Sequence, residues 1–253
     1  SDVCSSDLID LRNKATADVR HSLLEGGVTI DENEHRSQAG IRAATDAEAT
    51  FTHALVKGFE NGISARNTEA LVVKHSVVRD NRRGVFITGE DHTRRCGGDS
   101  NFDTYRDPIF EHTDIFNNRT GIMIHGSNIF VRVEKSNIIN NHGFGLELQG
   151  SALADKSYLS NNNIFGNNNA NEEDQSAQVR TYHQDNTVVL ENNYWRFISD
   201  PELHQSWDTR CDGDVSFTGF APEPIEDAGP IEDEIKDDVA QQSWARYTQQ
   251  NDG

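Results

Sequence analysis

Short segments of alternating apolar and polar residues recur along the chain, and each opens with a glycine. Gly40, Gly62 and Gly84 stand 22 residues apart and open the segments GIRA, GISA and GVFI. The same signature returns at Gly121 (GIMI) and Gly145 (GLEL), after intervals of 37 and 24 residues. The longer interval equals one 22-residue repeat plus a 15-residue insertion. An apolar spacing of two predicts short β-strands, and the sparse helix formers exclude a helical repeat.

A second apolar motif, centred on a polar pair, follows within each repeat. It reads VRHSLL (19–24), FTHALV (51–56), VKHSVV (73–78), FEHTDI (110–115) and VEKSNI (133–138). Asn-rich turns separate it from the next glycine. Three strands of three to five residues then make one coil, and each strand pairs with its equivalent in the next coil at about 4.8 Å. The sequence therefore predicts a solenoid, whose stability comes from the stacking of neighbouring coils.

Asparagines at one turn of successive coils are predicted to form an internal ladder, because a side-chain amide both donates and accepts hydrogen bonds. The residues assigned to it are Asn81, Asn118, Asn141 and Asn168.

The coils end in ENNYW (191–195), followed by SDPEL and by V-x-F-x-G-F-A-P-E-P. Together with the GI-x-I repeats, these strings resemble the right-handed parallel β-helix proteins. That superfamily includes pectate-lyase-like enzymes and the NosD-like periplasmic copper-accessory proteins. The resemblance covers about residues 9–225 and implies an all-β, single-stranded, right-handed parallel β-helix. In such proteins the usual ending is NNYWG, so Arg196 in place of glycine predicts a different turn there.

Three segments are expected: residues 1–8, a β-helix over 9–222 and an acidic tail over 223–253. Residues 1–8, SDVCSSDL, resemble the translation of a sequencing adapter and are excluded from the fold. On that interpretation the reading frame is a truncated metagenomic one that lacks its export signal and first coils. The tail contains a predicted helix at about 231–247 and either caps the open end of the solenoid or stays loosely ordered.

The amino-acid composition limits the classes of binding partner that this chain can have. A formal charge of −19, with 42 acidic against 23 basic residues, argues against nucleic acid and against anionic membranes. No apolar run approaches the ~18 residues of a membrane span. Solubility is the simplest explanation of the acidity. Apart from Cys4 in the excluded segment, Cys96 and Cys211 are too far apart to suggest a disulfide framework or a metal motif, and no metal site or cofactor is assigned.

Long loops interrupt the repeat near 25–39, 89–107 and 168–177. The middle loop places Arg94, Arg95 and Arg106 in a chain that is otherwise acidic, which predicts a substrate-binding spot for a carboxylate or sulfate. The alternative is a loop held together by its own Arg–Asp pairs.

The outward face of the glycine-led strands is the second candidate site. If the apolar residues point inward, their neighbours form two outward columns. One holds Ser64, Phe86, Met123, Glu147 and Arg180, and the other holds Arg66, Thr88, His125, Gln149 and Tyr182. We assign catalytic roles to His125, Glu147, Arg180, Arg66 and Tyr182, and substrate binding to Phe86, Met123 and Gln149. An ordinary solvated ladder of polar residues is the rival interpretation.

A histidine column is the third feature. His21, His53, His75 and His112 share one coil position, which Lys135 and Asn161 continue. Stacked imidazoles suggest a transition-metal site. The position is also a bend between strands, where histidine and asparagine are favoured in the left-handed conformation. The bend is the preferred explanation.

The sequence leaves three functions open. The first is an exported carbohydrate-active protein, lyase or hydrolase-like, acting on an acidic polysaccharide or cell-surface glycan in an extracellular or periplasmic, bacterial-type location. The second is a non-catalytic glycan-binding or structural solenoid, and the third a NosD-like metal-handling protein. The motif strings of pectate lyases, alginate epimerases and polygalacturonases are absent, so enzymatic activity is left undecided.

Overall fold

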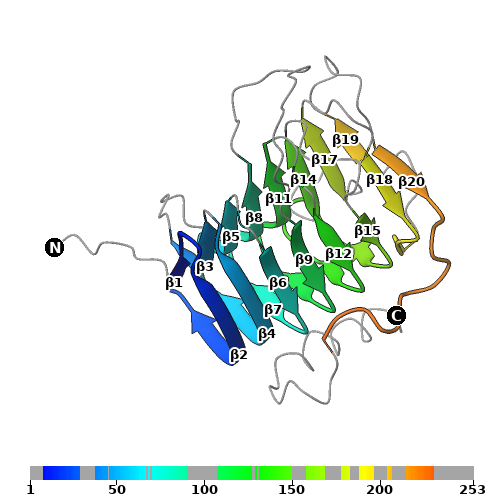
Figure 1. Ribbon diagram of the computed structural model, residues 1–253. Helices are drawn as coiled ribbons and strands as arrows, with labels where there is room; N and C mark the ends of the chain where they lie inside the picture. Colours follow the sequence, from blue (N-terminus) through cyan, green and yellow to red (C-terminus); the bar gives the residue numbers. More distant parts are fainter. Residues whose placement is uncertain are drawn as a thin grey trace.

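The computed structural model describes thirteen stretches of the chain, and every strand pairing among them is parallel. The stretches are residues 8–28, 38–44, 46–66, 68, 70–89, 107–126, 129, 131–149, 158–168, 178–182, 188–196, 204–206 and 215–230. The strands stack into a parallel β-helix, with each coil lying beside the next (Figure 1). The predicted fold class is therefore confirmed. No helix in the described part is long and apolar enough to cross a membrane.

Face A of the β-helix is an eight-stranded sheet made of the glycine-led strands. They are β1 (Ile9–Leu11), β3 (Ala39–Ala44), β5 (Asn61–Arg66), β8 (Arg83–Thr88), β11 (Thr120–His125), β14 (Leu146–Gln149), β17 (Val179–Tyr182) and β19 (His204–Ser206).

Two further faces meet at a bend, which β2 (Thr16–Glu25) and β4 (Glu48–Lys57) cross as single long strands. In later coils the strand divides into two shorter ones. Face B continues through β6 (Ala70–Lys74), β9 (Asp107–Glu111), β12 (Arg132–Glu134), β15 (Tyr158–Ser160), β18 (Val188–Glu191) and β20 (Val215–Thr218). Face C continues through β7 (Val77–Arg79), β10 (Asp114–Phe116), β13 (Asn137–Ile139) and β16 (Asn163–Phe165).

The repeat glycines line up as predicted because no side chain fits between their coils. A Cβ at Gly62 would lie 2.7 Å from the Gly84 carbonyl oxygen, and one at Gly84 would lie 2.7 Å from that of Gly121. The contact recurs between Gly121 and Gly145 at 2.6 Å. The 15-residue insertion between Gly84 and Gly121 therefore leaves the coil register intact.

The core is a continuous strip of stacked aliphatic side chains, one or two from each strand. Ile41, Ile63, Val85, Ile122 and Leu146 align from β3 to β14 and are fully buried. The outer side of each coil faces solvent. The apolar residues inside one coil are therefore buried mainly by the coils stacked on either side of it.

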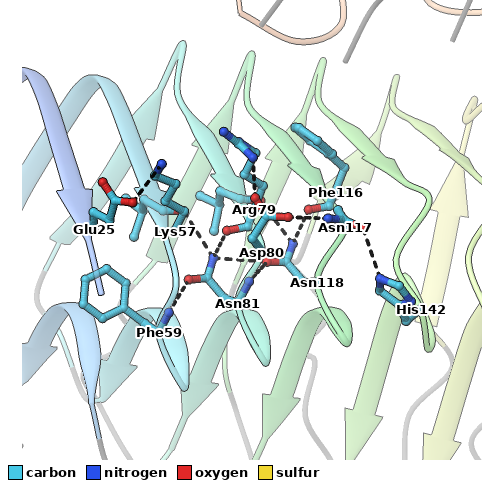
Figure 2. A network of polar contacts seen from close by, with 12 residues as sticks. Glu25, Lys57, Phe59, Arg79, Asp80, Asn81, Phe116, Asn117, Asn118 and His142 are labelled. Carbon is cyan, nitrogen blue, oxygen red and sulfur yellow. Dashed lines mark hydrogen bonds and ion pairs between the residues drawn. The ribbon is translucent and has the colours of Figure 1, made fainter. Parts of the chain in front are cut away.

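An amide ladder runs beside this strip at the bend between faces C and A (Figure 2). The Nδ2 atom of Asn81 donates to Oδ1 of Asn118 at 3.1 Å, and Asn118 donates to Asn141 at 3.1 Å. Asn141 donates to Asn167 at 2.9 Å, and Gln178 ends the ladder. The assignment of Asn168 was wrong: its neighbour Asn167 occupies the ladder, whereas Asn168 adopts a left-handed φ of 64°.

A second internal ladder follows the bend between faces B and C. The backbone N–H of Thr113 donates to Ser136, that of Ser136 to Asn162, and that of Asn162 to Asn193, at 3.1, 2.9 and 2.9 Å. These residues are buried, and the bonds satisfy main-chain donors where the strands turn.

The sequence predicts a different turn after Trp195, because Arg196 stands where glycine is usual, but the backbone does not show the change. Arg196 has a φ of 66°, in the left-handed region that glycine adopts most easily. The arginine therefore keeps the backbone shape of that ending, and its guanidinium lies 5.9 Å from the centre of the Phe165 ring.

After β20 the chain turns back along face C, as the orange segment in Figure 1 shows. Residues 221–229, which we call the C-terminal strap, are fixed by hydrogen bonds from the Ala221 N–H to Asn193 O and from the Gly229 N–H to Lys135 O. The strap contains most of the described part of the acidic tail, residues 223–230, and it runs back over the coils. The helix expected at 231–247 lies outside the described residues.

Candidate functional site

The register of face A aligns both outward columns that the sequence predicts. Ser64 pairs with Phe86, Phe86 with Met123, Met123 with Glu147, and Glu147 with Arg180. Arg66, Thr88, His125, Gln149 and Tyr182 align in the same way two residues further along each strand. The intervening residues point into the core, so these side chains form one outward surface at a spacing of about 4.8 Å per coil.

Glu147 and Arg180, the last two residues of the first column, form a charged pair on this surface. Arg180 Nη1 lies 4.0 Å from Glu147 Oε1, and both side chains are largely buried, at 19% and 14% exposed for Arg180 and Glu147 respectively. Burial raises the pKa of Glu147, although the charges of Arg180, Arg83 and Arg119 oppose the rise. The carboxyl thus titrates closer to neutral pH than an ordinary glutamate.

Aromatic rings hold the arginines of the surface in place. The Arg180 guanidinium lies 4.5 Å from the centre of the Tyr182 ring and 5.1 Å from that of Phe144. Arg83 lies 5.0 Å from the centre of the Phe86 ring. Cation–π contacts of this kind fix a planar guanidinium while leaving its N–H groups aimed at an incoming anion.

Arg83 and Arg119 are residues that the sequence analysis missed. In the sequence they stand shortly before the repeat glycines, in the strings NRRG and NRTG, which predict turns. In the structure Arg83 is the first residue of β8, and Arg119 lies in the turn before β11. Arg82 and Arg83 both contact the buried carboxylate of Glu60, each with one N···O distance of 3.2 Å. The four arginines 82, 83, 119 and 180 outnumber the two glutamates, which makes this part of an acidic chain locally cationic.

The residues of the second column lie at different distances from the Glu147–Arg180 pair. His125 pairs with Thr88 and Gln149, so it lies diagonally across from Glu147 on the neighbouring strand. Burial raises the pKa of Tyr182, with Glu147 adding to the rise and Arg180 opposing it. Arg66 is four strands from Arg180, about 19 Å at the usual coil spacing. Arg66 therefore cannot share one substrate carboxylate with Arg180.

The predicted loop site, with Arg94, Arg95 and Arg106, lies outside the described residues. Its assignment remains a prediction.

The histidine column lies at a bend between strands, which is the explanation that the sequence favours. His21, His53, His75 and His112 have φ values between 47° and 55°, and Lys135 and Asn161 continue them at 49° and 56°. The rings stack at 4.8, 5.4 and 4.9 Å with interplanar angles of 12°, 17° and 16°. Nitrogen lone pairs lie in the ring plane, so nearly parallel rings do not converge on an ion between them. Among the described residues, no three His, Cys, Asp or Glu side chains are grouped to hold a metal ion.

The fold and this surface define a parallel β-helix protein with an arginine-rich, aromatic-lined outward face. A family model described as a right-handed β-helix region matches residues 21–194, so the chain belongs to that family. The match supports a pectate-lyase-like or NosD-like superfamily fold and specifies no activity. Neither the curated proteins nor the solved structures searched gave a match.

Proposed function

We propose that this protein is an exported, carbohydrate-active β-helix protein that binds an acidic glycan along face A. The observation that carries the proposal is the Glu147–Arg180 pair, flanked by Arg83, Arg119 and the ring of Tyr182. A chain of anionic sugars laid along the axis would meet guanidinium groups and aromatic faces at coil spacing. Arginine suits such a ligand because its planar fork matches a carboxylate.

The same groups can support a lyase-type elimination. Arg180 would pair with the uronate carboxylate, which makes the adjacent C–H more acidic. Glu147, or His125 diagonally across from it, would accept that proton. The C–H electrons form a C=C bond, the C–O bond to the leaving sugar breaks, and Tyr182 would donate a proton to the departing oxygen. A raised pKa keeps Tyr182 protonated at neutral pH, which suits the acid and not the base.

Replacing Arg180 with alanine is expected to weaken binding of a polyuronate about 10- to 100-fold, because one charge-assisted contact contributes about 1.5–3 kcal/mol. Titration calorimetry with alginate or pectin oligomers at low salt would measure the loss. Arg132→Ala is the matched control, since Arg132 is exposed on face B. Equal affinities for the Arg180 and Arg132 variants would contradict a binding role for face A.

Screening of alginate, pectin and glycosaminoglycans for unsaturated products tests the enzymatic part. Activity should rise with pH through the raised pKa of Glu147, and Glu147→Gln should remove both this acidic limb and most of the turnover. His125→Ala decides which group is the base. If the wild-type protein turns over none of these glycans, the proposed lyase activity on them is wrong. Binding on a glycan array without cleavage would instead support the alternative function, a non-catalytic glycan-binding solenoid.

A further inference from the structure

The C-terminal strap crosses face C by pairing its backbone with a column of side-chain amides. The Ile225 N–H donates to Asn163 Oδ1 at 2.8 Å, and Asn163 Nδ2 donates back to Ile225 O at 3.1 Å. One coil earlier, Asn137 Nδ2 donates to Ala228 O at 3.2 Å. Asn163 also donates to Asn137 at 2.7 Å, so the two amides form an outward ladder beneath the strap.

The last member of this column is a carboxyl group, Asp114. Asn137 Nδ2 donates to Asp114 Oδ1 at 2.7 Å, and the register aligns Asp114 with Val77 and Asn137, neither of which is charged. Gly229 closes over the carboxyl with a φ of 92°, and a Cβ there would lie 2.6 Å from Asp114 Oδ1. The strap therefore shuts Asp114 away from water, and no cation in the described part of the chain contacts it.

We propose that the C-terminal strap is a pH-dependent clasp, seated on face C while Asp114 is protonated and released as that carboxyl ionises. Water can reach the carboxylate only if Gly229 moves away. The strap backbone, which is bonded to the side-chain amides of Asn163 and Asn137, would then separate from them, and face C would become exposed to solvent.

The titration of Asp114 supports this direction. Burial under the strap raises its pKa to about 7, although the hydrogen bond from Asn137 opposes the rise. In the released state the group has the ordinary aspartate pKa near 4. A raised pKa in the seated state means that seating loses stability as pH rises between these two values, by about tenfold in the seating equilibrium per pH unit. Above about pH 7 the loss levels off.

Other charged groups also lie around the strap. Lys135 Nζ lies 2.7 Å from Asp227 Oδ2, and this pairing lowers the pKa of Asp227, so the pair stays charged across the range. The His112 Nδ1–H donates to Asp227 O at 2.8 Å. Glu223 and Glu226 are exposed.

Hydrogen exchange of the full chain at pH 4.5 and pH 7.5 tests the clasp. The protection factors of the Ile225 and Gly229 amides, corrected for the intrinsic pH dependence of exchange, should fall on the order of 100-fold at the higher pH. Amides of β13 should stay protected at both pH values, which separates release of the strap from unfolding of the coils. Wild-type strap protection that is equal at both pH values would overturn the proposal.

Three variants test whether ionisation of Asp114 causes the release of the strap. Asp114→Asn keeps the acceptor for Asn137 without the ionisation, so its strap should stay protected at both pH values. An unchanged pH dependence in this variant would also overturn the proposal. Asp227→Asn should lower protection at both pH values and keep the pH slope. Gly229→Ala should release the strap at either pH, and full protection in it would contradict the close approach over Asp114.

Discussion

Replacing Asn118 with leucine should lower the free energy of unfolding by about 3–5 kcal/mol, because each buried polar group left without a partner costs about 1–3 kcal/mol. The Asn118 amide accepts from the backbone N–H of Asn81 at 3.0 Å and donates to the carbonyl of Val78 at 3.1 Å. Leucine satisfies neither group. Asn81 lies in the turn after β7, and Val78 is the middle residue of β7 itself.

Urea denaturation followed by circular dichroism would measure the change, and hydrogen exchange would show whether the coils around Asn118 open first. His142→Ala is the control. The His142 side chain is exposed and contacts Asn117 Oδ1 at 3.0 Å, and the substitution leaves the backbone bond from His142 N–H to Asn118 O in place, so the change should stay within about 0.5 kcal/mol. A leucine variant as stable as the His142 variant would show that the ladder contributes nothing to stability.

A single added methyl group at Gly84 is the second change with a large expected effect. Its Cβ would lie 2.7 Å from Gly121 O, 2.9 Å from Asn118 Nδ2 and 3.0 Å from Ile115 Cγ2. Backbone atoms of the next coil cannot retreat without breaking their own pairing, so Gly84→Ala should cost about 2–3 kcal/mol.

Gly27 provides the matched comparison, since a Cβ there would meet nothing within 4 Å. Gly27→Ala should be neutral or slightly stabilising. Thermal unfolding of the two variants side by side would measure the difference. Similar midpoints for both would contradict the close stacking of coils at the repeat glycines.

The sequence was sufficient to predict the coils and columns because glycine spacing reports where neighbouring backbones touch. Gly62, Gly84 and Gly121 stay aligned despite a 15-residue insertion, since the insertion leaves the coil at a strand end. The ladder was predicted one residue off at its end, at Asn168. Three asparagines follow one another at 167–169, and only the turn geometry decides which one points inward.

Other features depend on contacts that leave no pattern in the sequence. Arg83 starts β8 and Arg119 precedes β11, and both are close enough to Glu147 to oppose the rise in its pKa, which the strings NRRG and NRTG do not indicate. The strap is held through backbone atoms of Ile225, Ala228 and Gly229, which any residue type provides. The elevated pKa of Asp114 follows from burial by a segment more than 100 residues later in the chain.

Stacking in register gives face A a length that is proportional to the number of coils. Gain or loss of one 22-residue repeat would add or remove a single row of outward side chains, about 4.8 Å of outward surface, without repacking the remaining interior. Under the glycan binding that we propose, a relative with one coil more would contact about one additional sugar unit. Oligomer-length preference among such relatives should track how many times the glycine-led segment occurs.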